Sequence, residues 1–159
     1  MKLSHILAVV LVIVICLVIV MVAFSGKGVP AVPAMANTTQ TPFDSAGALY
    51  SQSVDLANAG KYADALTAAD QALAQNTSAL TPIIQANRAG ILVMLGRYEE
   101  ANAAADVAIS APGNLTTTRS IAYYNKGDAL RHLNRIDEAK TAYAKAAELD
   151  PSLTNPYTS

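Results

Sequence analysis

Residues 96–101 read GRYEEA, and variants of this hexapeptide occur at 60–65 (GKYADA) and 134–139 (NRIDEA). Their final alanines, Ala65, Ala101 and Ala139, are 36 and 38 residues apart. A period slightly above about 34 residues is typical of stacked helical hairpins with extra residues in the loops. Such arrays usually present a surface to a partner. The repeat therefore predicts an all-α binding module.

The sequence between the hexapeptides predicts two helices in each repeat. Asp44 or Ser45 can cap the first, because a short oxygen-bearing side chain satisfies free amides at a helix start. A glycine in the hexapeptide allows a tight turn within a hairpin, and Pro151 ends the last helix because proline disfavours helix at the preceding residue. We expect helices over 44–58, 62–75, 81–95, 98–110, 118–133 and 136–149.

Small and large apolar residues recur at equivalent places in the three repeats. Small residues let two helix axes approach closely, and leucines fill the space beside the contact. Each hairpin is therefore expected to pack on its neighbour. The leucines are Leu56, Leu92 and Leu130, the small residues three positions earlier are Ser53, Ala89 and Gly127, and the second helices carry Ala65, Ala101, Ala139, Ala72, Ala108 and Ala146.

The arrangement resembles the tetratricopeptide repeat family over residues 45–153. The third repeat fits best, with Tyr123, Gly127, Leu130, Ala139, Tyr143, Ala146 and Pro151 at the positions of that family's signature. The first two repeats depart from it at Leu49, Gln85 and Ala105, where the family has aromatic residues. The resemblance implies a right-handed α-solenoid of three helix-turn-helix repeats within 44–153, at about 46–79, 82–115 and 120–153.

If the resemblance holds, the first helix of each repeat lines a concave groove for a protein or peptide partner. Asn87 and Asn125 occupy the same place in successive repeats, and an amide can bond both an N–H and a C=O of an extended peptide. A solvated polar helix face is the alternative interpretation. The Lys/Asn clamp that some members use for a C-terminal carboxylate is not matched. Candidate groove residues are Tyr50, Ser51, Asn87, Tyr124, Asn125, Asp128, Arg131 and His132.

The N-terminal region predicts a membrane anchor. After a flank at 1–5, residues 6–24 contain no charged side chain, and 19 helical residues span roughly 28 Å, close to the hydrocarbon thickness of a bilayer. Residues 25–43 are rich in Pro, Gly and Thr and predict an extended linker. A short tail follows at 154–159. We expect a transmembrane helix acting as a signal anchor, a stalk and the repeat domain.

Two observations favour an extracytoplasmic repeat domain. Lys2 and the α-amino group give the N-terminal flank the larger positive charge. Asn37, Asn76 and Asn114 each begin an N-glycosylation acceptor pattern. Ala34-Met35-Ala36 resembles a signal-peptidase site, so secretion after cleavage near Ala36 is the alternative to a retained single-pass anchor.

Composition argues against several other functions. A net charge of −1 without a basic stripe does not suit a nucleic-acid partner. The only cysteine, Cys16, lies in the apolar segment, and His132 is the single histidine of the repeat region. Catalysis and metal binding need converging groups that the pattern lacks. We therefore expect no enzyme, cofactor or metal. The alternative function is a structural subunit of a membrane or envelope complex, and the open face of the last hairpin suggests a homo-oligomer.

Overall fold

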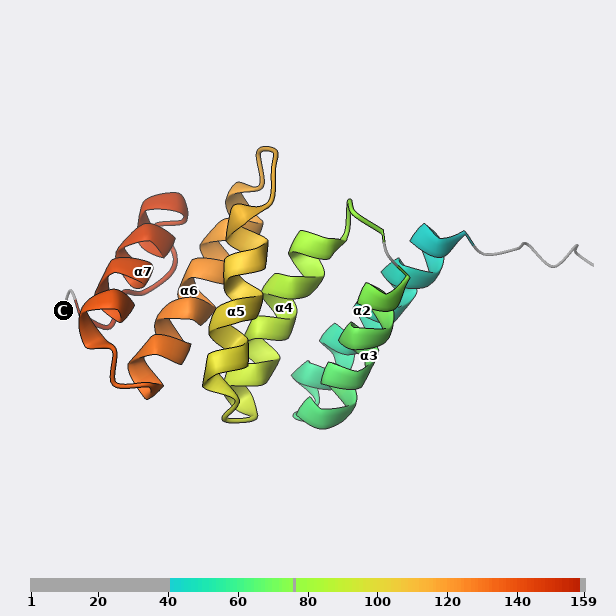
Figure 1. The fold of residues 1–159 in the computed structure, drawn as a ribbon, viewed down its shortest axis with the longest axis horizontal. Coiled ribbons are helices and arrows are strands. Elements are labelled where there is room, and N and C mark those ends of the chain that lie inside the picture. Colours follow the sequence, from blue (N-terminus) through green and yellow to red (C-terminus); the bar gives the residue numbers. More distant parts are fainter. Residues whose placement is uncertain (1–40, 76, 158–159) are drawn as a thin grey trace, which may run out of the picture. The chain divides into compact units, whose positions relative to one another are not determined.

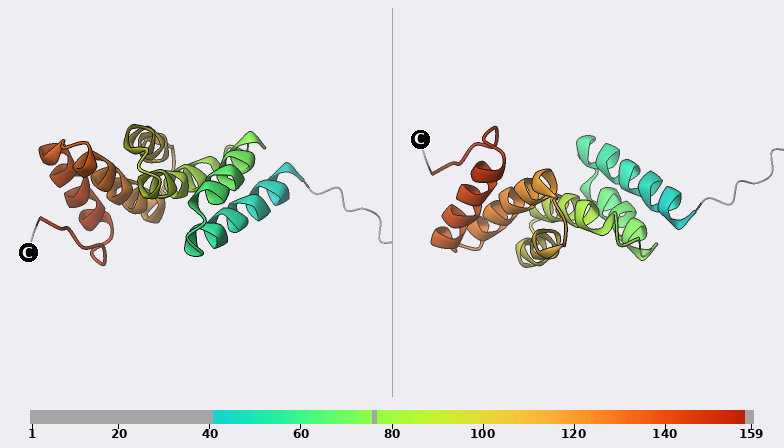
Figure 2. Two further views of the ribbon diagram at one scale, coloured as in Figure 1. Left: turned by 90° about the horizontal axis from the view of Figure 1, so that it is seen from below. Right: turned by 90° about the horizontal axis from the view of Figure 1, so that it is seen from above.

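In the part of the chain that the structure describes, every regular secondary-structure element is an α-helix. The computed structural model describes residues 41–75 and 77–157, and these form three consecutive hairpins (Figure 1; Figure 2). This confirms the expected all-α helical-repeat fold. The first hairpin is α2 (Pro42–Asn58) and α3 (Tyr62–Ala74), the second is α4 (Thr81–Met94) and α5 (Tyr98–Ser110), and the third is α6 (Thr116–His132) and α7 (Ile136–Leu149).

The predicted membrane segment is not part of the described structure. Residues 6–24, the linker up to residue 40, and the sequons at Asn37 and Asn76 lie outside the described residues. Within 41–75 and 77–157, none of the helices is both long enough and apolar enough to cross a bilayer.

Helix α2 begins earlier than the sequence suggested. Thr41 is the N-cap, and its side chain accepts a hydrogen bond from the Asp44 backbone N–H at 3.2 Å. Asp44 accepts in return from the Thr41 N–H at 3.3 Å, completing a capping box. The prediction that Asp44 or Ser45 is the cap is therefore wrong. Pro42 fits the first helical position because its missing N–H needs no partner there.

The hexapeptides form the turn of each hairpin. Gly60 and Gly96 both have φ of 74°, and Asn134 takes their place in the third repeat with φ of 61°. This left-handed conformation is open to glycine and, among the other residues, most readily to asparagine. The next residue then bonds back to the repeat leucine, as in Arg97 N–H to Leu92 O at 2.9 Å. The hexapeptide thus ends one helix and starts the next.

Alanines form the seams between the helices. The six repeated alanines of α3, α5 and α7 are fully buried, as are Leu92 and Leu130. In the third hairpin Tyr143 is 1% exposed and lies against Gly127, where an added Cβ would come within 2.9 Å of the ring. Gly127 was predicted to let two helix axes approach closely. In the structure, the space left by its missing side chain is filled by the Tyr143 ring and not by the backbone of a neighbouring helix.

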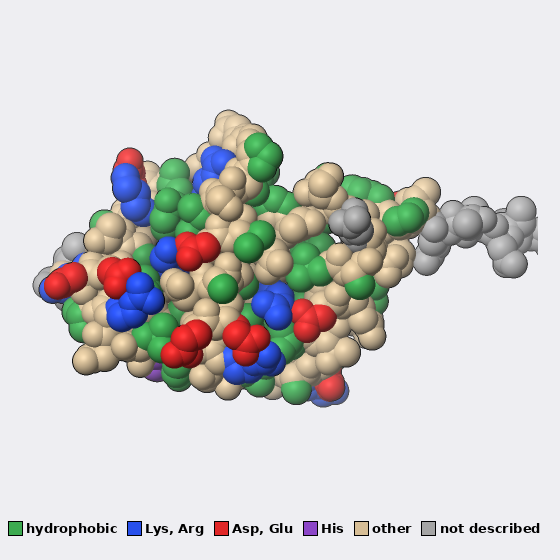
Figure 3. Space-filling view, in the orientation of Figure 1, with side chains coloured by type: hydrophobic (Ala, Val, Ile, Leu, Met, Phe, Trp, Pro, Cys, Tyr) green, Lys and Arg blue, Asp and Glu red, His purple; other side chains and the backbone are tan. Residues whose placement is uncertain are grey.

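Neighbouring hairpins are joined by repeated ion pairs. Asp70 of α3 bonds Arg88 of α4 at 2.7 Å. Asp106 of α5 pairs with Lys126 of α6 at the equivalent positions of the next junction. Figure 3 shows basic and acidic side chains beside one another on this face. Helix α4 packs along α6, whereas α2 hardly contacts α4, so the first and second hairpins are less closely joined on the α2/α4 side.

The chain turns back after α7. The segment from Asp150 runs alongside that helix (Figure 1). The Tyr157 ring lies 5.9 Å from the Tyr143 ring, and the Lys140 ammonium is 5.7 Å from the Tyr157 ring centre. This segment covers part of the last hairpin, the surface that suggested self-association. The homo-oligomer stays a prediction.

Candidate functional site

Side chains of α2, α4 and α6 surround two adjoining hollows. The larger, of about 260 Å³, lies where Asn87, Gly90 and Met94 of α4 face Ile121, Asn125 and Asp128 of α6. The smaller, of about 130 Å³, is lined by Tyr50, Ile83, Asn87 and Ile121, together with two threonines of α6. Asn87 and Ile121 line both hollows. We call the two hollows together the α2/α4/α6 groove.

The structure gathers four of the eight predicted groove residues in this groove: Tyr50, Asn87, Asn125 and Asp128. Tyr124 is half-buried and packs on Tyr143, with ring centres 5.4 Å apart and the rings edge to face. Ser51, Arg131 and His132 are exposed and do not line either hollow. Burial raises the pKa of the Tyr50 hydroxyl.

Each of the two asparagines uses one amide N–H inside the array. Asn87 Nδ2 donates to Ser53 Oγ at 3.0 Å, and Ser53 in turn donates to the Ala65 carbonyl at 2.8 Å. Asn125 Nδ2 donates to the Ala86 carbonyl at 2.9 Å. Each asparagine therefore ties its helix to the preceding repeat. Neither Oδ1 accepts a hydrogen bond from the described residues, so both oxygens can accept one from a ligand.

Polar residues at the end of α6 also contact neighbouring helices. The Tyr143 hydroxyl donates to Asp128 Oδ1 at 2.5 Å, and Arg131 Nη2 lies 3.4 Å from the same oxygen. Burial, followed by the bond to the Asp128 carboxylate, raises the pKa of Tyr143. The His132 ring stacks on Tyr98 with centres 4.4 Å apart. These bonds hold α6 against α7 and α5.

Sequence reasoning missed the aliphatic residues of the groove. Ile83, Met94 and Ile121 are 37%, 58% and 42% exposed, although each is large and apolar. Ile83 and Ile121 each stand four residues before a groove asparagine, which places isoleucine and asparagine on one helix face. The repeated Ile-x-x-x-Asn spacing could have revealed them.

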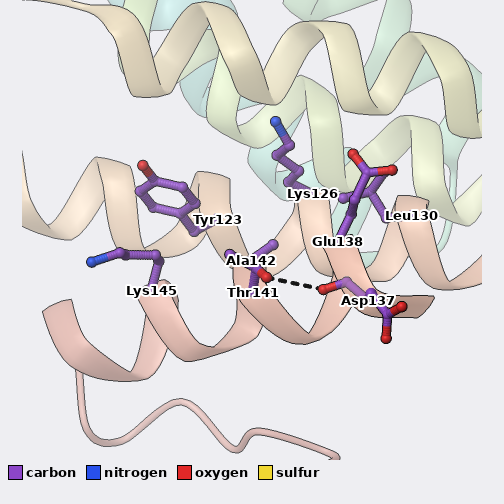
Figure 4. Close-up of a pocket in the computed structure, with 8 residues that line it drawn as sticks. All are labelled: Tyr123, Lys126, Leu130, Asp137, Glu138, Thr141, Ala142 and Lys145. Atoms are coloured by element: carbon purple, nitrogen blue, oxygen red, sulfur yellow. Dashed lines mark hydrogen bonds between the residues drawn. The ribbon is translucent and has the colours of Figure 1, made fainter. Parts of the chain in front are cut away.

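A separate hollow of about 340 Å³ lies between α6 and α7. Figure 4 shows Tyr123 and Lys145 at one end and Asp137 and Glu138 at the other. Its charged groups already have partners: Lys145 bonds Glu148 at 2.7 Å and Glu138 bonds Arg135 at 2.6 Å, while Lys126 pairs with an α5 aspartate. The bond to Arg135 lowers the pKa of Glu138, and the bond to Glu148 raises that of Lys145.

The α6/α7 hollow has an equivalent in the first hairpin. A hollow of about 310 Å³ between α2 and α3 is lined by Gln52, Leu56, Asp64 and Gln71 at the matching positions. Lys126 and Lys145 are thus replaced by glutamines, while the shape is kept. Because the cleft keeps its shape in two hairpins while its side chains differ, we attribute it to the geometry of the hairpin and not to a binding function. We therefore regard the α2/α4/α6 groove as the candidate binding site.

Residues for a metal site do not converge in the structure. Over 41–75 and 77–157, no three His, Cys, Asp or Glu side chains are placed to hold a metal ion. The polar residues of the groove are two amides, the hydroxyls of two tyrosines and two threonines, and one carboxylate that is already bonded to Tyr143. The groove therefore offers apolar contact together with uncharged hydrogen-bonding groups.

Comparison with known proteins supports the repeat assignment. Two family models, each described as tetratricopeptide repeat, match residues 50–114 and 121–153. The search of curated proteins found no match to the chain. Among solved structures, the first TPR of Spaghetti (RPAP3) bound to the HSP90 peptide SRMEEVD is similar, with 24% identity and a TM-score of 0.59. The match covers 67% of this chain and 80% of that one.

A second similar structure is the NMR structure of the first TPR domain of human RPAP3. It has 24% identity and a TM-score of 0.60, and the match covers 69% of this chain and 81% of that one. At this identity the two structures establish a shared fold.

Proposed function

Because the chain belongs to the tetratricopeptide repeat family, we propose that it is a protein-interaction module whose α2/α4/α6 groove binds a segment of a partner protein. The observation that carries the proposal is the exposure of Ile83, Met94 and Ile121 beside Asn87 and Asn125. Large apolar side chains left open to water in a hollow, with hydrogen-bond acceptors beside them, are typical of binding sites.

The similarity to a peptide-bound structure supports the same assignment. The Spaghetti (RPAP3) domain is described as bound to an HSP90 peptide. Its fold is shared here, and the groove in question lies on the first helices of the repeats. From that structure we take only the use of the fold to bind a peptide; the identity of the peptide and the place where it binds are not carried over.

We further propose that residues 6–24 anchor the module in a membrane, with 25–40 as a stalk before the N-cap of α2 and the repeats on the extracytoplasmic side. The uncharged 19-residue run, Lys2 before it and the sequon at Asn114 support this arrangement. Immunoblotting of membrane and soluble fractions tests it. A soluble product beginning near Asn37 would support secretion instead.

Site-directed photo-crosslinking in native membranes tests the binding function. A photoreactive residue at Ile121 should crosslink a partner, whereas the same residue at Val107 of α5, 46% exposed, should not. Equal crosslinking from both positions would contradict the groove. A single neighbour recovered in constant proportion from position 121 would favour the structural-subunit alternative over a receptor for several partners.

A further inference from the structure

The chemistry of the groove narrows the class of partner. We propose that the α2/α4/α6 groove recognises an uncharged, extended segment with aliphatic side chains, and not an acidic peptide or a C-terminal carboxylate. This inference rests on the proposed function, since it specifies what the same groove binds.

The first argument is a repeated pair of side chains. Ile83 and Asn87 of α4 are matched 38 residues later by Ile121 and Asn125 of α6. In both helices the pair is spaced i, i+4 and therefore lies on one face. Each isoleucine offers apolar surface, and each asparagine offers a free Oδ1 beside it. An extended chain crossing the two helices meets the same combination twice.

The second argument is the size of the hollows. The smaller hollow, of about 130 Å³, has Ile83 and Ile121 in its lining and Tyr50 at one side. An apolar cavity of about 150 Å³ can hold a benzene molecule. The smaller hollow thus suits one aliphatic side chain, and the larger, of about 260 Å³, suits a bigger one beside Met94. Because the hollows adjoin, neighbouring side chains of one segment can fill both.

The third argument is charge. Across the described residues, neither hollow is lined by a lysine or arginine, and Asp128 is the one charged side chain in the linings. That carboxylate already bonds Tyr143 and faces Arg131. The remaining titratable lining groups are Tyr50 and Tyr62. An acidic ligand would meet the Asp128 carboxylate and no cation in the lining itself, whereas an uncharged segment has no such cost.

The asparagine geometry favours a backbone contact in the middle of a segment. One amide N–H of Asn87 is used by Ser53, and one of Asn125 by the Ala86 carbonyl. What remains on each residue is the Oδ1 acceptor and the second amide N–H, a pair that matches the N–H and C=O of a peptide backbone. A terminal carboxylate could accept from the amide N–H groups but would leave both Oδ1 atoms without a donor, and it would meet no cation in the lining.

Selection from a randomised heptapeptide library tests the inference. The full-length chain in detergent micelles is the bait, beside the double variant Ile83→Ser/Ile121→Ser and the control Val107→Ser, which removes an exposed apolar residue from α5. Wild type and control should enrich aliphatic peptides poor in Asp and Glu. The double variant should bind the selected peptides about tenfold more weakly, as expected for loss of two anchors. Unchanged helicity and melting temperature show that the variants are folded.

A charge substitution gives an independent readout. Ile121→Lys places a cation in the groove at a position that is 42% exposed. This variant should gain binding to the acidic peptide SRMEEVD, while wild type should bind it at least about tenfold more weakly than the selected aliphatic peptides.

The outcomes separate the two proposals. Acidic peptides enriched by wild type and lost on Ile83→Ser/Ile121→Ser would overturn the partner class while leaving the groove as the binding site. Aliphatic peptides that bind the double variant as well as wild type would also overturn the inference. No enrichment with any bait would overturn the proposed function and the inference together.

Discussion

Replacing Gly127 by alanine tests the packing of the third hairpin. The new Cβ would lie 2.9 Å from two carbons of the Tyr143 ring and 3.0 Å from a third. Carbon atoms pack comfortably at about 3.5–4.0 Å, so the ring or helix α6 must move. The ring is 1% exposed and its hydroxyl is bonded to Asp128, which leaves it little freedom to do so.

The expected magnitude comes from two opposing effects. Alanine is favoured over glycine inside a helix by about 1 kcal/mol, and overpacking a core costs about 1–3 kcal/mol. Gly47 of α2 supplies the matched control, since nothing lies within 4 Å of its added Cβ. Gly47→Ala should therefore raise the free energy of unfolding by about 1 kcal/mol above that of wild type. The free energy of unfolding of Gly127→Ala should be lower than that of Gly47→Ala by about 1–3 kcal/mol.

Urea unfolding followed by circular dichroism measures both variants. Adding Tyr143→Leu should remove most of the difference, because the smaller side chain leaves room for the methyl group. If Gly127→Ala is stabilised as much as Gly47→Ala, the close contact between Gly127 and the ring does not exist. If the penalty persists with Tyr143→Leu, its origin lies elsewhere than in the ring.

Three further predictions concern separate parts of the chain. The raised pKa of Tyr143 means that the folded protein keeps this phenol protonated at a pH where the unfolded chain ionises it. The free energy of unfolding should therefore fall above about pH 10, by up to about 1.4 kcal/mol per pH unit. In urea titrations between pH 9 and 11, Tyr143→Phe should show a smaller fall with pH than wild type, and equal slopes would contradict this. Thr41→Ala should lower the free energy of unfolding by about 1 kcal/mol through loss of the N-cap, whereas Thr41→Ser keeps the cap and the stability. Thermal unfolding measures both variants, and an equal loss of stability in both would argue against the capping box. Asn114 is exposed in the α5–α6 connection, which projects beyond the helices (Figure 1), and its Oδ1 accepts a hydrogen bond from the Thr116 hydroxyl at 3.0 Å. When the protein is expressed in a eukaryotic secretory pathway, Asn114→Gln should abolish a glycosidase-sensitive shift in gel mobility. Absence of that shift in wild type would oppose an extracytoplasmic domain.

The helices could be predicted from sequence because the repeat states the same local signals three times. A left-handed residue, a leucine before it and an alanine after it define each turn without any tertiary information. The start of α2 was missed because Pro42 was assigned to the stalk. In the structure Pro42 opens the helix directly after Thr41.

The site was only partly predictable because several contacts depend on how helices face one another. Asp128 was expected in the groove, and it lines the groove, but its partner Tyr143 comes from α7 and reaches it across Gly127. Sequence gives no direct signal for such a contact. Ile83 and Ile121 were not predicted to line the groove, because large apolar residues on a helix usually belong to a core.

The asparagines show a similar limit. Their repetition indicated a shared role, and the structure gives Asn87 and Asn125 a shared structural one, each bonding the preceding repeat. A side chain with both a donor and an acceptor can serve the fold with one group and a ligand with the other. The spacing of the asparagines alone does not show which group serves the fold and which is left for a ligand.

Isoleucine-methyl NMR of the full-length chain, titrated with a selected uncharged aliphatic heptapeptide, tests the groove most directly. Ile83 and Ile121 line it, whereas Ile109 and Ile136 line neither of its hollows. We expect saturable shifts of the Ile83 and Ile121 methyl signals, with those of Ile109 and Ile136 unmoved. Shifts confined to Ile136, at the start of α7, with Ile83 and Ile121 unchanged would contradict binding in the α2/α4/α6 groove.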